Sequence, residues 1–293
     1  MIKSKYLILS GLYFNFNDDL SEITNVKKSF EKKNILDLFR FDNLNNISHH
    51  MTLDFEKIRF IYLSTLINEI KSYLFYYNQI DILDLSNCIN LKNIDEKAFF
   101  KINVKILSLP QNIENIKKLS FSQCEIEILN ISKCIKIKYI EDRAFASNHI
   151  KHVRFPKNIE NIGVCAFMYN NIETLNLSNC HNLNVIKEWA FDNNQIKYLK
   201  LPENIKKINI EAFKSNKIEI LDLSDCKKLK KIGKYAFDGN PLKEIKILKK
   251  IKLDIDIEYK NGLWNDFAKY YNKNKKKAGN YKLENNEWKL YLL

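Results

Sequence analysis

The sequence predicts an α/β solenoid, built mainly of short parallel strands with one-turn helices. Two observations predict it. A cysteine and an alanine–phenylalanine pair return at a fixed interval of 46 residues, and an L-x-L pattern recurs twice within each interval. Such self-similarity is typical of a chain that stacks like coils, each burying its apolar edge against the next.

The interval of 46 residues is found in four independent series of residues. They are Cys88, Cys134, Cys180 and Cys226; Phe99, Phe145, Phe191 and Phe237; Pro110, Pro156 and Pro202; and Phe121, Phe167 and Phe213. Because the four series share one register, the interval defines the repeating unit of the fold.

Each interval divides into a long coil of 24 residues and a short coil of 22 residues. The long coil reads I-x-x-L-x-L-S-x-C-x-x-L-x-x-I-x-x-x-A-F-x-x-N, and the short coil reads I-x-x-L-x-L-P-x-N-I-x-x-I-x-x-x-A-F-x-x-N. Long coils span 125–148, 171–194 and 217–240, with a weaker copy at 79–102; short coils span 57–78, 103–124, 149–170 and 195–216. We interpret residues 32–56 as a degraded coil.

Each part of a coil predicts a local structure. L-x-L has the period of a strand whose leucines face inward, and stacked strands form a parallel sheet. The next apolar pair should begin the return path, and Ala-Phe should form a single helical turn with Phe in the core. The Asn that ends a coil should turn the chain with positive φ, which Asn tolerates. These residues are Asn148, Asn170, Asn194, Asn216 and Asn240.

The end of the chain departs from the repeat. Residues 262–274 have the pattern of a short amphipathic helix, and 281–284 and 287–291 should form a hairpin across Asn285-Asn286. Repeat arrays need caps because the terminal coil would expose its apolar edge. We therefore predict three parts: an N-terminal cap or leader at 1–31, the solenoid at 32–248, and a C-terminal cap at 249–293.

These motifs together resemble the BspA-type leucine-rich repeat of bacterial and protist surface proteins. The resemblance is carried by L-x-L-S-x-C-x-x-L from Leu221 to Leu229, L-x-L-P-x-N-I from Leu199 to Ile205, and the recurrent A-F-x-x-N. It covers 57–248 strongly and 32–56 weakly. The tail resembles the segment that ends many spirochaete members, although Asn280 replaces the usual Thr. The resemblance implies a leucine-rich-repeat solenoid that binds proteins, by adhesion to host or partner proteins, without catalysis.

The outward strand positions are the candidate binding surface. One row alternates acid and base without exception: Asp81, Lys105, Glu127, Lys151, Glu173, Lys197, Glu219 and Lys243. Such charges should meet as cross-strand pairs. Exposed apolar, aromatic and basic side chains beside this row are candidates for contact with a protein partner on a concave sheet. They are Ile106, Ile128, His152, Arg154, Tyr198, Lys200 and Ile220. The alternative is that Ile is simply a favoured strand residue.

The charge of the chain suggests a second function. The net charge is +13, and the tail is its densest part, with Lys273, Lys275, Lys276 and Lys277 close together. Such a run could bind an anionic surface or nucleic acid, although a solvated loop is the more common outcome. The alternating row argues against a uniformly basic sheet, so we expect a protein partner rather than nucleic acid.

Residues for catalysis or for metal binding do not form a recognisable pattern. The sequence has no Ser/His/Asp arrangement, phosphate loop or C-x-x-C pair, so we expect no enzyme, cofactor, metal or small-molecule substrate. The four periodic Cys should stand about 10 Å apart, too far for disulfides. Since Asn112, Asn158 and Asn204 take the same place in the short coils, we interpret this position as structural. We expect a monomer.

The location of the protein stays open at this stage. The resemblance implies the cell surface. The run 6–14 is apolar after Lys3 and Lys5, but acidic and amide residues follow it with no small-residue cleavage site, which favours the cytoplasm. No apolar stretch approaches the roughly 18 residues of a transmembrane helix.

Overall fold

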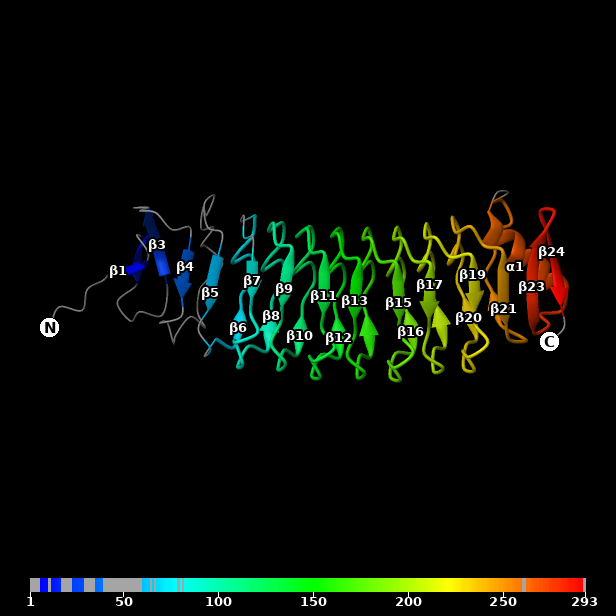
Figure 1. Ribbon diagram of the computed structural model, residues 1–293, viewed down its shortest axis with the longest axis horizontal. Helices are drawn as coiled ribbons and strands as arrows, with labels where there is room; N and C mark the ends of the chain where they lie inside the picture. Colours follow the sequence, from blue (N-terminus) through cyan, green and yellow to red (C-terminus); the bar gives the residue numbers. More distant parts are fainter. Residues whose placement is uncertain are drawn as a thin grey trace.

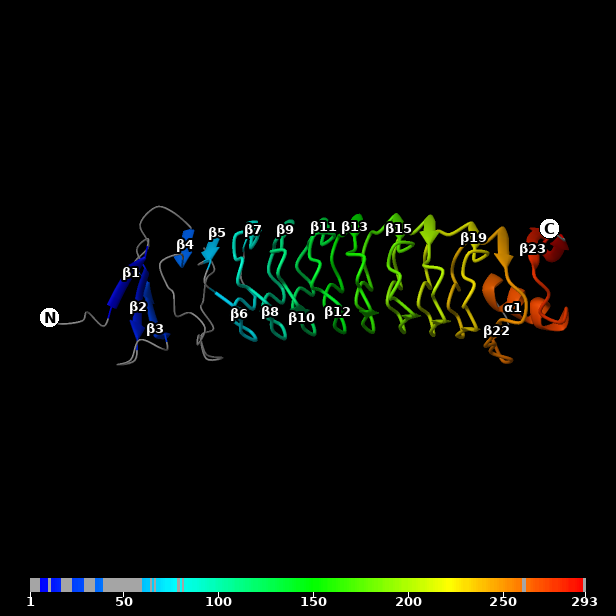
Figure 2. The same cartoon turned by 90° about the horizontal axis from the view of Figure 1, so that it is seen from below.

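The computed structural model describes residues 6–9, 12–16, 23–28, 35–38, 60–63, 65, 67–77, 80, 82–259 and 262–291. Side chains are described for 63, 65, 67–77, 80, 83–259 and 262–291. The coils form a row that runs almost straight in both views (Figures 1 and 2). The strand face is therefore nearly flat, not concave as the sequence led us to expect.

The L-x-L strands form the first parallel sheet, as predicted. Its eight strands follow one another along the row in the order of the coils. They are β4 (Ile35–Leu38), β5 (Phe60–Leu63), β7 (Ile82–Asp84), β9 (Ile106–Ser108), β11 (Ile128–Asn130), β13 (His152–Arg154), β15 (Thr174–Asn176) and β17 (Tyr198–Lys200). Since β4 pairs in register with β5, the degraded coil also contributes a strand.

The return path forms a second parallel sheet of nine two-residue strands. They are β6 (Glu69–Ile70), β8 (Asn93–Ile94), β10 (Asn115–Ile116), β12 (Tyr139–Ile140), β14 (Asn161–Ile162), β16 (Val185–Ile186), β18 (Lys207–Ile208), β20 (Lys231–Ile232) and β22 (Lys252–Leu253). Each places a buried apolar residue, mostly Ile, toward the first sheet. The prediction that this apolar pair starts the return path is confirmed.

Stacked phenylalanines fill the space between the sheets. Eight rings lie one above the next with centroids 5.1–5.6 Å apart and planes within 16° of parallel. They are Phe75, Phe99, Phe121, Phe145, Phe167, Phe191, Phe213 and Phe237, all fully buried. Trp264 continues the column at 4.9 Å from Phe237. Burial of such rings is the main apolar contribution of each coil to stability.

The Ala-Phe segments are single turns closed by hydrogen bonds between residues three apart, such as Ala144 N–H to Glu141 O. Their alternate N–H groups also donate to the next coil, as Phe145 does to Ala166 O at 2.9 Å. Positive φ occurs twice per turn, at Arg143 and Ser147 in this coil. The prediction of positive φ at Asn148 itself was wrong, because the residue before Asn adopts it.

The coil-ending Asn instead acts through its side chain. The buried Asn194 donates from Nδ2 to the carbonyls of Phe167 and Phe191 at 2.9 and 3.2 Å. Its Oδ1 accepts from Ile172 N–H at 3.1 Å. Asn148, Asn170, Asn216 and Asn240 repeat these bonds. Cys124 occupies the same place in its coil and bonds Phe99 O through its thiol at 2.8 Å. This asparagine ladder satisfies backbone groups that the turns leave open.

The alternating Cys/Asn position also has a structural role. Asn112, Asn158 and Asn204 each donate to a backbone carbonyl of the preceding coil, in agreement with the prediction. All six cysteines of the chain are free and buried.

The C-terminal elements follow the last coil and match the predicted helix and hairpin. They are α1 (Leu263–Lys273), β23 (Gly279–Glu284) and β24 (Glu287–Tyr291). Asn285 and Asn286 both have positive φ, as a tight two-residue hairpin turn requires. β19 (Ile220–Asp222) and β21 (Glu244–Ile247) form a four-stranded sheet with the hairpin. Because β23 runs antiparallel to β21, it covers the edge of the last parallel strand.

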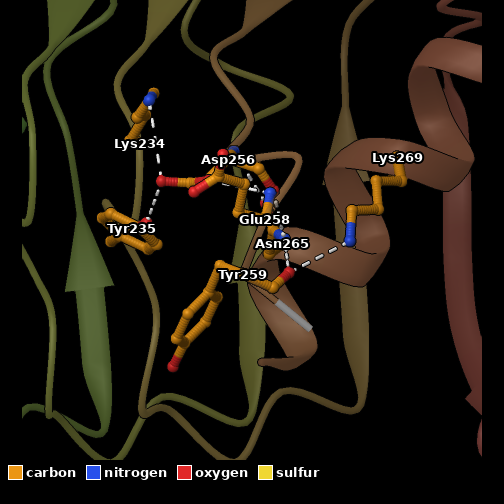
Figure 3. Close-up of polar contacts among 7 residues, drawn as sticks. All are labelled: Lys234, Tyr235, Asp256, Glu258, Tyr259, Asn265 and Lys269. Carbon is orange, nitrogen blue, oxygen red and sulfur yellow. Dashed lines mark hydrogen bonds and ion pairs between the residues drawn. The ribbon is translucent and has the colours of Figure 1, made fainter. Parts of the chain in front are cut away.

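Polar contacts fix the segment between β22 and α1 to the last coil (Figure 3). Asp256 accepts from the Tyr235 hydroxyl and pairs with Lys234 at 3.7 Å. Its backbone is held by Asn265 of α1, which also donates to Tyr259 O at 2.9 Å. The hydrogen bond to Asp256 raises the pKa of Tyr235 to about 12, so this phenol stays protonated at neutral pH.

At the other end, β1 (Tyr6–Leu9), β2 (Leu12–Phe16) and β3 (Ile23–Lys28) form an antiparallel sheet. They lie within the predicted cap or leader at 1–31. The rest of that segment is outside the described residues.

Candidate binding face

All seven predicted contact residues lie on the outer face of the first sheet or its continuation in β19. Ile106, Ile128, Tyr198 and Ile220 are exposed by 57, 54, 70 and 58%. His152, Arg154 and Lys200 are exposed as well. The alternation of strand side chains thus places them as the sequence predicted.

The alternating charge row forms ion pairs at three of its steps. Glu219 and Lys243 are 2.8 Å apart, Glu173 and Lys197 3.3 Å, and Lys105 and Glu127 3.8 Å. Lys151 makes no ion pair within the described residues, and the side chain of Asp81 is outside them. The prediction of cross-strand pairs is therefore confirmed for part of the row.

Pairing between the strands alternates along the sheet, which the sequence did not predict. Every step from a long coil to the following short coil has at least three register pairs. The opposite step weakens toward the C-terminus, with two pairs at β9–β11 and one at β13–β15. The next step, β17–β19, has none, so the ladder breaks there and the sheet divides. We call these three weak steps the seams.

The residue that follows each strand explains the alternation. In long coils its N–H donates to the next coil; Leu177, for example, donates to Lys200 O at 2.8 Å. In short coils the corresponding Leu109, Phe155 and Leu201 precede prolines, and these three make no such bond to the next coil. Proline restricts the backbone of the residue before it. The seams therefore fall where a short coil with proline after its strand meets the next long coil.

Two of the seams hold grooves on the outer face. A groove of about 470 Å³ at β13–β15 is lined by His152, Arg154 and Phe155, among others. A larger one of about 830 Å³ at β17–β19 is lined by Tyr198, Lys200 and Ile220. Five of the seven predicted residues thus meet at two seams. Ile106 and Ile128 do not line either groove.

The β17–β19 seam continues past the strands into a further hollow. This second hollow, of about 430 Å³, shares Leu199, Lys200 and Asp222 with the larger groove. Leu199 is only partly buried, whereas Leu175 and Leu221 beside it are buried almost completely. An inward leucine is thus accessible at this seam. The L-x-L pattern did not predict this accessibility, because the residues described at the same position in the other coils are buried.

Some charged side chains around the larger groove form ion pairs and others do not. Lys197, Glu219 and Asp222 are each engaged in an ion pair with a neighbouring strand. Lys200 and Lys217 also line the groove and make no ion pair within the described residues. The groove therefore combines an aromatic ring, apolar side chains and two cations free to meet a partner's carboxylates.

The cysteines near these hollows are not suited to nucleophilic chemistry. Cys180 and Cys226 lie beside the seams but are only 2% exposed. Burial raises the pKa of Cys180 to about 11 and that of Cys226 to about 12. Both thiols therefore stay protonated at neutral pH, and the thiolate is the reactive form.

Metal ligands and membrane spans were also considered. Over the described ranges, His, Cys, Asp and Glu do not gather in threes that could bind a metal ion. In the same part of the chain, helices are too short or too polar to cross a bilayer.

Comparisons with known proteins agree on the repeat. The family model described as "BspA type Leucine rich repeat region" matches six copies, at residues 23–149, 68–181 and 138–257. A leucine-rich repeat protein from Bacteroides ovatus has a TM-score of 0.59 and 18% identity, covering 84% of this chain and 66% of that chain. A leucine rich cell surface protein from Faecalibacterium prausnitzii has a TM-score of 0.29 and 16% identity, covering 82% and 54%.

This chain thus spans just under two thirds of the length of the first solved structure and about half of the second. At this identity the first likeness concerns the fold alone. No curated protein matches the chain.

Proposed function

The chain belongs to the BspA-type leucine-rich repeat family, and we propose that it is a non-catalytic scaffold that binds a protein partner across the seams of its first sheet. The single observation that carries this proposal is the groove at β17–β19. There the ladder stops, an inward leucine becomes accessible, and an exposed aromatic ring stands beside it.

The composition of this groove supports a protein partner. Tyr198 and Ile220 supply a large, rigid contact area, and aromatic and Arg residues carry much of the energy of protein interfaces. His152 and Arg154 at the neighbouring seam lie two coils away, roughly 10 Å along the sheet. One partner can therefore contact both seams at once.

The more specific role that we propose is adhesion at the cell surface. Family resemblance supports it, since BspA-type repeats occur in surface proteins. The buried, protonated thiols are consistent with a role in binding rather than in catalysis.

Site-specific photo-crosslinking tests the proposed contact. A benzophenone amino acid would replace Tyr198 in one variant and Tyr139, a 47% exposed tyrosine of the second sheet, in another. Both proteins would be incubated with host or source-cell protein and irradiated. We expect a discrete cross-linked protein from position 198 and none from position 139.

The captured protein would then be titrated against the unmodified chain and against Tyr198→Ala. We expect binding to weaken at least about tenfold, as for a central aromatic contact. Unchanged folding by circular dichroism is the control, because Tyr198 is 70% exposed. Equal cross-linking from both positions, or equal affinity of the variant, would refute this site.

Location is tested separately by treating intact source cells with a protease and following the chain by immunoblot. Loss of the chain while a cytoplasmic marker survives would support adhesion. Protection until lysis would exclude adhesion and leave a partner inside the cell.

A further inference from the structure

Lysines gather on one edge of the last coils. The turns that connect the first sheet to the second form an edge of the row of coils (Figure 1). The turns of coils 195–216 and 217–240 and the turn between β21 and β22 carry six lysines. The loop after α1 adds three more. We call this set the basic edge: Lys206, Lys227, Lys228, Lys230, Lys249, Lys250, Lys275, Lys276 and Lys277.

Backbone hydrogen bonds show that these segments are neighbours, although they span more than 70 residues of sequence. Lys230 N–H donates to Lys206 O at 2.9 Å, and Lys252 N–H donates to Lys230 O at 2.8 Å. Lys250 N–H donates to Lys276 O at 2.9 Å, which joins the loop after α1 to the turn of the preceding coil. The sequence suggested a basic tail only, whereas the fold extends it across three coils.

The charges of the basic edge are not neutralised locally. Eight of the nine lysines are exposed, and Lys276 is half-buried. Among the described residues none of the nine forms an ion pair, whereas Lys231, Lys234 and Lys252 close by do. Glu203 and Asp225 are the carboxylates on the same turns. Nine cations against two anions give a strong local positive potential.

Earlier coils carry this charge less densely. The same turn in coil 125–148 has Lys133, Lys136 and Lys138, of which Lys138 pairs with Glu160 at 3.0 Å, and in coil 149–170 it has Lys157. In coil 171–194 the turn has no lysine. That coil separates the basic edge from the earlier lysines.

We propose that the basic edge binds an anionic lipid membrane surface. Its cations are all lysines on turns, and the set contains no aromatic ring on which a nucleic-acid base could stack and no arginine fork to read base edges. Flexible ammonium groups along an edge suit a planar array of headgroups. Clusters of four to eight basic residues are typical of such binding, and each adds about fivefold to membrane partitioning.

The test is sedimentation of the full chain with vesicles at low salt. One set of vesicles would contain equal parts of phosphatidylcholine and phosphatidylglycerol, and the other pure phosphatidylcholine. We expect binding to the anionic vesicles only, lost at several hundred millimolar salt because screening weakens exposed charges.

A matched pair of variants locates the binding surface. The edge variant carries Lys228→Gln, Lys230→Gln, Lys249→Gln and Lys250→Gln. The control carries Lys118→Gln, Arg143→Gln, Lys151→Gln and Lys282→Gln, which removes the same charge from exposed basic residues that lie off these turns and have no ion pair in the described part of the chain. We expect partitioning to fall on the order of a hundredfold in the first and only a few-fold in the second.

Two outcomes would overturn the proposal. Equal loss in both variants, or no binding by the unmodified chain, would mean that no lipid site exists at this edge. Displacement by a single-stranded oligonucleotide at much lower phosphate concentration than competing vesicles would assign the edge to nucleic acid instead. Neither outcome bears on the seams, since all substituted residues lie outside both seam grooves and the hollow that continues the β17–β19 seam.

Discussion

The steps from long to short coils and the steps from short to long coils differ mainly on the first sheet. Long-to-short steps have at least three register pairs and an additional bond such as Leu177 N–H to Lys200 O. Short-to-long steps lose pairs progressively until β17 and β19 are unpaired. The hydrogen bonds between the Ala-Phe turns of neighbouring coils are the same at both kinds of step. Phe167 N–H donates to Ala190 O and Phe191 N–H donates to Ala212 O, each at 2.9 Å.

This difference indicates that the stacking of the coils does not depend on strand pairing in the first sheet. The phenylalanine column, the asparagine ladder and the second sheet continue through every seam. The first sheet is therefore free to open and present grooves, while the interior maintains the spacing of the coils. Binding surfaces are commonly carried by the part of a scaffold that its stability does not require.

The largest expected effect comes from removing the C-terminal segment that covers β21. The β19–β21 step before it has three register pairs, and we call such long-to-short steps strong steps. We propose that 249–293 is a C-terminal cap, because β23 covers the edge of β21 and Trp264 covers Phe237. Deleting this segment should expose an unpaired strand edge and an aromatic core, so the truncated chain should aggregate. Size-exclusion chromatography would measure this, and a soluble monomeric truncation would refute the assignment.

Next in size is the loss of one ring from the column. Phe191 stacks on Phe167 across a seam and on Phe213 across a strong step. Phe191→Ala should therefore lower the free energy of unfolding by about 3–5 kcal/mol. Tyr198→Ala, on the open face, should change it by less than about 1 kcal/mol. Similar losses in denaturant titrations of the two variants would show that the first sheet contributes as much as the interior.

The sequence predicted the interior well because burial follows its period. A Phe every 22 or 24 residues can only form a column if each coil closes once per repeat. For Asn194 we predicted a backbone role, a positive φ. The sequence does not show that carbonyl groups of the neighbouring coil lie within reach of its side chain. The seams were also missed, because they depend on hydrogen bonds between strands of neighbouring coils, which the sequence does not show. The partial exposure of Leu199 occurs at the unpaired seam and does not follow from its own motif.

A smaller loss should follow from removal of one member of the asparagine ladder. Asn194→Ala leaves the carbonyls of Phe167 and Phe191 and the N–H of Ile172 without this side chain. Unsatisfied buried groups cost about 1–3 kcal/mol, so we expect a loss of about 2–3 kcal/mol for the set. Cys124→Ala at the equivalent place removes a weaker donor and should cost less. If thermal or chemical denaturation ranked the two the other way, the ladder would not be what joins coils across the seams.

The smallest effect tests whether an ion pair of the charge row stabilises the step that it spans. Lys243 lies 2.8 Å from Glu219 across a strong step, whereas Lys151 has no ion pair in the described part of the chain. Both are exposed, so Lys243→Gln should cost no more than about 1 kcal/mol, and Lys151→Gln less. The difference between them should shrink as salt is raised, because exposed pairs are screened. Denaturant titrations at low and high salt would measure it. A cost for Lys243→Gln that persists at high salt would mean that the side chain stabilises its step by packing of its aliphatic stem and not by its ion pair with Glu219.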